Sequence, residues 1–121
     1  MTLIEAIAKT DEVKPNALSN SDKIRYISNL DLSIKKFMSQ YEVSSTPFNG
    51  YTDNTDMDTE LLVEAPFDDI YIYWLAAQID YWNDEVESYD NNMTMYSSVL
   101  SDYRKDYHRH HMPKQRNFKF F

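Results

Sequence analysis

Three histidines near the end of the chain, at positions 108, 110 and 111, are the side chains best suited to bind a metal ion. His108 and His111 are three residues apart, a spacing that brings two histidines to one face of a helix, where they can share a metal. Arg104, Lys105 and Arg109 surround them. Because positive side chains stabilise the C-terminal end of a helix, the sequence favours a cationic helix end over a metal site.

Four acids in the middle of the chain, Asp53, Asp56, Asp58 and Glu60, raise the question of calcium binding. An EF-hand loop needs oxygen ligands at alternate positions, then a glycine, and finally a bidentate Glu. Only Asp56 and Asp58 fit the beginning of that pattern. We therefore expect a solvated acidic loop, with no metal and no cofactor.

Catalytic chemistry finds little support in the sequence. The chain has no cysteine and a single glycine, so it lacks a thiolate nucleophile and a glycine-rich phosphate loop. Carboxylates are abundant, but nothing in their spacing separates an acid–base pair from ordinary surface charge. We expect that the protein is not an enzyme.

Charge is distributed very unevenly along the chain. Residues 37–103 contain fourteen acids and no Lys or Arg, whereas residues 104–121 contain six bases and one acid. The last segment carries +5, and since the whole chain carries −8, residues 1–103 carry −13. Direct nucleic-acid binding is not expected of such an acidic body. The pattern fits a solvated surface with a basic tail, or a bipolar molecule whose basic end meets an acidic partner.

The elements that position these residues are predicted to be helices in one domain, because 121 residues with a single glycine disfavour strands and their turns. A capping box of Thr2 and Glu5 predicts a short first helix, and Ser19 begins a second over about residues 20–42. Without a long apolar run or a signal-peptide pattern, we expect a soluble protein. The polar face of the second helix is predicted to carry Lys23, Arg25, Asp31, Lys35 and Lys36.

An apolar stripe with an unbroken spacing of four and three residues organises residues 66–112. Pro66 has the residue type preferred at the first position of a helix. The spacing favours one continuous or kinked helix of about 44 residues, about 66 Å long, over a hairpin that reverses near residues 83–92. Its first half, apolar on nearly all sides, is predicted to pack against the helix at 20–42. Its second half is predicted to form an intersubunit seam of Tyr89, Met93, Tyr96, Leu100, Tyr103 and Tyr107.

Two segments lie outside this helical pattern. Residues 43–65 are predicted to form a long surface loop with a turn at Asn49-Gly50 and a short β-like piece near residues 60–64. After a helical domain over residues 1–112, residues 113–121 form a basic, Phe-rich extension typical of a docking segment. With the residue before it, this tail consists of Met112, Pro113, Lys114, Gln115, Arg116, Asn117, Phe118, Lys119, Phe120 and Phe121.

A series of short segments over residues 48–113 resembles the head-to-tail connector (adaptor, or head completion) proteins of long-tailed phages that infect Gram-positive bacteria. These segments are Phe48-Asn49-Gly50-Tyr51, residues 55–62, residues 65–71, residues 77–85, Tyr89-Asp90-Asn91-Asn92-Met93 and His110-His111-Met112-Pro113. These segments follow one another in the same order as in the connector proteins. Asp84 stands where many relatives are expected to have glycine, which favours the continuous helix.

The resemblance implies an all-α subunit of a ring, a 12-mer by family analogy, at the portal vertex of the virion. Such a ring extends the DNA channel without specific DNA binding and receives a downstream neck, stopper or tail-completion protein. The tail is implied to bind the portal. The loop is implied to face a neighbouring subunit or the channel through Phe48, Asn49, Gly50, Tyr51, Asp53, Asp56, Asp58 and Glu60. The alternative is an acidic helical binding module or inhibitor that acts as a monomer on a host or phage protein.

Overall fold

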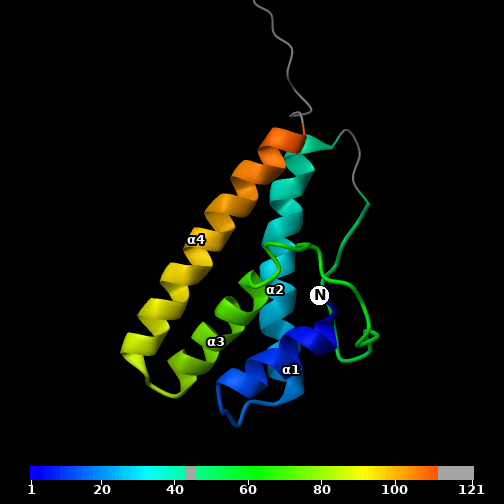
Figure 1. Ribbon diagram of the computed structural model, residues 1–121. Helices are drawn as coiled ribbons and strands as arrows, with labels where there is room; N and C mark the ends of the chain where they lie inside the picture. Colours follow the sequence, from blue (N-terminus) through cyan, green and yellow to red (C-terminus); the bar gives the residue numbers. More distant parts are fainter. Residues whose placement is uncertain (43–45, 112–121) are drawn as a thin grey trace, which may run out of the picture.

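The computed structural model describes residues 1–42 and 46–111, which form an all-α bundle. Its helices are α1 (Leu3–Val13), α2 (Asn20–Met38), the short 3₁₀ helix η1 (Ser39–Tyr41), α3 (Ile70–Trp82) and α4 (Val86–His110). Figure 1 shows α3 and α4 as a hairpin, with α2 beside it and α1 across the base. The predicted fold class, with a short first helix, a second near 20 residues and a long last one, is confirmed.

Both predicted N-terminal caps are present. The N–H of Thr2 donates to the Glu5 carboxylate at 2.8 Å, and the N–H of Glu5 donates to Thr2 Oγ1 at 3.3 Å. These bonds satisfy two of the amides that a helix start leaves without partners. The Ser19 hydroxyl accepts from the N–H of Asp22 at 3.1 Å in the same way.

The chain breaks between α3 and α4, so the prediction of one continuous helix is wrong. Asp84 has φ +59°, in the left-handed region that ends a helix. The N–H of Glu85 donates to the carbonyl of Asp80 at 2.9 Å, and that of Asp84 to Tyr81 at 3.3 Å. This bond pattern is a Schellman motif with Asp84 in the position usually held by glycine. The absence of glycine at position 84 therefore did not keep the helix continuous.

Asp80 closes this hairpin from its buried position on α3. Its Oδ2 accepts hydrogen bonds from Ser88 Oγ at 2.8 Å and Asn92 Nδ2 at 2.7 Å, both on the first turns of α4. Its Oδ1 lies 2.6 Å from Lys14 Nζ, at the end of α1. Burial raises the pKa of Asp80, but these partners outweigh burial and hold it below its ordinary value. The charged carboxylate therefore joins three helices at one point.

The start of α3 also differs from the prediction. The helix begins at Ile70, four residues after Pro66, because turns occupy the intervening residues. The N–H of Phe67 donates to the carbonyl of Glu64, and the N–H of Ile70 donates to that of Phe67. Pro66 is therefore part of the connection into α3 and not its first residue.

Most of the predicted intersubunit seam is used inside the chain. Tyr103 and Tyr107 are only 7% and 9% exposed and belong to the core, and Tyr96 and Leu100 pack against it. An intersubunit role is therefore wrong for Tyr103 and Tyr107, because the hairpin turns this face of α4 towards α2 and α3. Tyr89 and Met93 are half-buried, and their intersubunit role stays a prediction.

The core combines all four α-helices with the central loop. Every helix contributes fully buried or nearly buried apolar side chains, and the loop adds Tyr51, Leu61 and Val63. Residues 57–61 also run beside the N-terminus, where Leu3 and Ile4 donate backbone hydrogen bonds to Thr59 and Met57. A single antiparallel bridge joins Thr2 and Glu60, and no strand forms in the described parts of the chain.

Candidate docking site at the end of α4

A cluster of aromatic rings fixes the last turns of α4 against the end of α2. Tyr107 lies at the centre, with ring-centroid distances of 5.4 Å to Phe37 and 5.2 Å to Tyr41 in edge-to-face geometry. The His111 ring stacks on Tyr107 at 3.8 Å, with the two planes 7° apart. Edge-to-face and offset aromatic pairs add to the stability that burial provides. These contacts therefore hold the end of α4 against the end of α2.

The three histidines take part in this arrangement in separate ways. His108 Nδ1 lies 3.1 Å from the Tyr41 hydroxyl, His110 Nδ1 lies 2.9 Å from the Asp106 carbonyl, and His111 Nδ1 contacts the Tyr107 carbonyl. The Tyr107 carbonyl belongs to the last four of α4, which lack intrahelical partners, so the His111 contact can satisfy it. Among the described residues no group of three His, Asp or Glu side chains is arranged to hold a metal ion.

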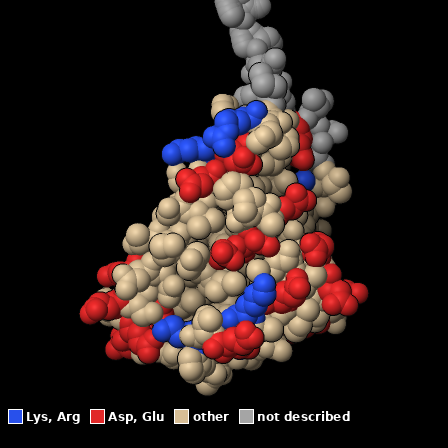
Figure 2. All heavy atoms as spheres, in the orientation of Figure 1, with Lys and Arg blue, Asp and Glu red and all other residues tan. Residues whose placement is uncertain are grey.

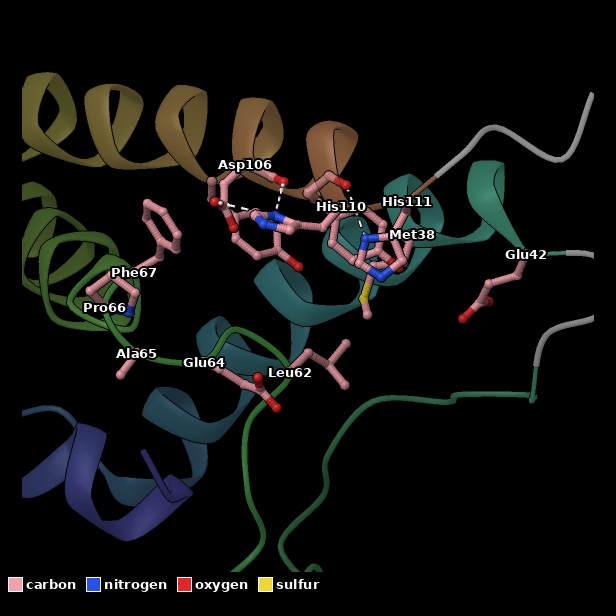
Figure 3. Close-up of a pocket in the computed structure, with 12 residues that line it drawn as sticks. Met38, Glu42, Leu62, Glu64, Ala65, Pro66, Phe67, Asp106, His110 and His111 are labelled. Atoms are coloured by element: carbon pink, nitrogen blue, oxygen red, sulfur yellow. Dashed lines mark hydrogen bonds and ion pairs between the residues drawn. The ribbon is translucent and has the colours of Figure 1, made fainter. Parts of the chain in front are cut away.

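An open groove of about 550 Å³ lies between the end of α4, the end of α2 and residues 62–67 (Figure 3). Glu64 and Leu62 reach it from the loop, Asp106 and His110 from α4, and Glu42 from beyond η1. The remaining lining residues are Met38, Ala65, Pro66, Phe67, Tyr103, Tyr107 and His111. The groove thus combines an apolar wall with three carboxylates.

Basic side chains also gather at this end of the molecule. Figure 2 shows Lys and Arg gathered near the end of α4, whereas Asp and Glu are spread over much of the remaining face, with further bases near α1. Arg104, Lys105 and Arg109 are exposed, and the Arg104 guanidinium lies 5.5 Å from the centre of the Phe37 ring. The bases near the end of α4 therefore form one group, with acids both beside them and over the rest of this face.

Asp31 holds the loop that forms one wall of the groove. Its fully buried carboxylate accepts from the Tyr51 hydroxyl at 2.5 Å and the Leu62 N–H at 3.1 Å on Oδ2, and from the Tyr71 hydroxyl at 2.6 Å on Oδ1. Burial raises the pKa of Asp31, and the three hydrogen bonds offset only part of that effect. Its predicted place on the polar face of α2 is therefore wrong.

The prediction that Lys23 lies on the polar face of α2 is also wrong. Its side chain is nearly buried, and its Nζ lies 2.9 Å from Asp11 Oδ1 on α1. Arg25 and Lys36 are exposed as predicted, and Lys35 is half-buried. Asp31 and Lys23 were missed because their partners lie in other elements, where helical spacing along α2 gives no information.

The predicted loop residues fall into two groups. Gly50 has φ +84°, and a side chain there would collide with Ser28, whose hydroxyl accepts the N–H of Tyr51 at 2.9 Å. Tyr51 is buried and the half-buried Phe48 packs on its ring, so both belong to the structure of the loop. Asn49, Asp53, Asp56, Asp58 and Glu60 are exposed and remain candidates for a neighbour- or channel-facing surface.

Three of the exposed acids have structural partners, one of which is Glu60, 3.5 Å from the N-terminal ammonium group of Met1. Asp53 accepts from the Ser21 hydroxyl on α2 at 2.9 Å, and Asp56 accepts from the N–H of Asp58 at 2.9 Å. The predicted tail, Met112 to Phe121, lies outside the described residues.

No helix in the described part of the chain is both long enough and apolar enough to cross a membrane. Comparison of the sequence and structure with protein-family models, curated proteins and solved structures finds no match.

Proposed function

We propose that this protein is a virion subunit that forms a ring at the portal vertex of a phage head, joining the portal to the neck and tail. The observation that carries the proposal is the ordered series of segments over residues 48–113 that resembles head-to-tail connectors. The contacts of Tyr107 with Phe37 and Tyr41 support it, because they hold the end of α4, from which the tail continues, against the end of α2.

The acidic body supports a role around DNA. Residues 37–103 contain no Lys or Arg, so a channel wall made from them repels phosphates and lets DNA pass without specific binding. The tail, by contrast, carries three bases and three Phe residues that suit anchoring to the portal. A downstream neck or stopper protein binds the ring on its other side.

A ring also needs a heterologous contact between subunits, and the turn between α3 and α4 offers one. Tyr81, Trp82 and Val86 are 69%, 60% and 66% exposed there, beside a hollow that Tyr89 also lines. Large apolar side chains grouped on a surface are typical of an interaction site. This turn replaces Tyr103 and Tyr107 as the proposed contact between neighbouring subunits.

A second candidate function is an acidic binding module or inhibitor that acts as a monomer. The observation that favours it is the hairpin itself, since α4 covers its seam within one chain and needs no neighbour for its core. The two candidates differ in whether the chain binds a portal and oligomerises there.

Sedimentation of the purified chain mixed with portal rings of the same phage tests the proposal. We expect the full chain to sediment with the portal, and deletion of residues 113–121 to abolish this while helix content by circular dichroism is unchanged. The double substitution Phe120→Ser and Phe121→Ser is expected to weaken attachment at least tenfold, because it removes the apolar anchors but keeps every charge.

Two results contradict parts of this account. A full chain that remains monomeric and apart from the portal argues against the connector function and leaves the binding module. Attachment that survives the deletion shows that another surface, and not the tail, contacts the portal.

A further inference from the structure

The groove at the end of α4 lies where the tail begins. His111, the last described residue, is part of its lining, so residues 112–121 continue from the edge of the groove itself. A segment tethered this closely reaches a neighbouring site at an effective concentration on the order of millimolar. Even a weak affinity then leads to occupancy.

The chemistry of the groove complements that of the tail. Leu62, Pro66 and Phe67 give it an apolar wall, and Glu42, Glu64 and Asp106 supply carboxylates. The tail contains Lys114, Arg116 and Lys119 among three Phe residues. Extended segments of this kind bind through apolar anchors in pockets, with charges that set their position.

The carboxylates of the groove are accessible to new partners. Glu64 is exposed and forms no ion pair with any described residue. Asp106 lies 3.4 Å from Arg109 and 3.5 Å from His110, and Glu42 lies 3.5 Å from Lys35, all as partly exposed pairs. Pairs of this kind contribute little stability, so exchanging them for tail cations costs little.

We propose that the tail of the free subunit docks in this groove of its own chain, with Phe side chains against Leu62 and Phe67 and basic side chains at Glu64 and Asp106. A partner that captures the tail must then displace it from the groove. This contact does not require the proposed ring, and it applies equally to a chain that acts as a monomer.

Engineered disulfides test the contact in the full-length chain. The sequence has no cysteine, so the pair Ala65→Cys and Asn117→Cys reports groove occupancy alone and keeps every Phe and basic residue of the tail. The matched control pair is Gln40→Cys and Asn117→Cys, because Gln40 lies at the same end of the molecule beside Lys36 and Arg104. Both partner positions, Ala65 and Gln40, are exposed, so the fold should tolerate them.

On mild oxidation we expect the groove pair to form an intramolecular disulfide about tenfold faster than the control pair, as mass spectrometry and gel mobility report. Adding Glu64→Lys is expected to remove most of this difference, and high salt to reduce it, because both weaken the attraction between tail and groove.

Three results would overturn the proposal. Equal rates for the two pairs show that the tail does not prefer the groove. Disulfide-linked dimers as the main product show that the tail occupies a second copy of the chain. An unchanged rate after Glu64→Lys shows that the groove carboxylates do not hold the tail.

Discussion

The carboxylate of Asp31 accepts hydrogen bonds from three parts of the chain that are far apart in sequence. Tyr51 and Leu62 belong to the central loop and Tyr71 to the first turn of α3. The Tyr71 hydroxyl in turn accepts the N–H of Val63 at 2.8 Å. Since a buried donor left without an acceptor is costly, this one side chain fixes the loop against α2 and α3.

Asp31→Asn tests the electrostatic state of this site. Burial raises the pKa of Asp31 in the folded chain above its ordinary value of 3.8. At a pH between 3.8 and the raised pKa, the folded chain therefore binds more protons than the unfolded chain. The free energy of unfolding of the native protein therefore falls as the pH rises through this window. Asn does not titrate. We therefore expect Asp31→Asn to lower the free energy of unfolding, measured in urea, by less at about pH 7 than at about pH 4.

Asp31→Ala serves as the comparison for that experiment. It leaves two tyrosine hydroxyls and one amide without an acceptor, and we expect a loss of about 3 kcal/mol at neutral pH. Asn retains a side-chain oxygen and should lose less. Equal costs for Asn at both pH values would show that Asp31 titrates as an ordinary surface carboxylate.

Helical spacing along α2 did not indicate this role. At Asn49-Gly50, where a turn was predicted, the structure shows only that Gly50 has φ +84°. A turn signal is local, because it depends on the φ that glycine adopts. The partners of Asp31 are 20 to 40 positions away, so only the folded chain brings them together.

At the scale of elements, the helix starts were predictable and the break was not. Thr2 and Ser19 cap helices through bonds to residues three positions later, which a sequence shows directly. The apolar stripe indicates only which face of a helix is buried, and not which helix covers it. A spacing of four between Trp82 and Val86 spans the turn, so the stripe continues unbroken through a chain reversal.

Asp84→Gly tests the break between α3 and α4, because Asp84 is the residue with positive φ at that point. Glycine adopts positive φ without the steric cost that a Cβ brings, so we expect this substitution to stabilise the fold by about 0.5–1 kcal/mol in urea or thermal unfolding. In a continuous helix the same change would destabilise by about 1 kcal/mol.

Asn83→Gly provides the matched control, because Asn83 has φ −86° and gains nothing from glycine. We expect no stabilisation there. Destabilisation by Asp84→Gly would contradict the hairpin and restore the long helix.

At the scale of the whole molecule, the structure has an acidic body and one end where bases, an apolar groove and the chain exit meet. The charge polarity was readable from composition, whereas the groove was not, because its walls come from α2, the loop and α4. The ring and its partners remain proposals that rest on the resemblance and on this polarity. A connector should therefore present the end of α4 to the portal and its acidic surfaces to the channel.

Electron microscopy of portal particles incubated with the full chain tests the connector function most directly. We expect a closed additional ring coaxial with the portal channel, with the end of α4 nearest the portal. We also expect that the ring is absent when residues 113–121 are deleted. Portal particles that remain unchanged, or that carry single copies without a ring, would contradict the account.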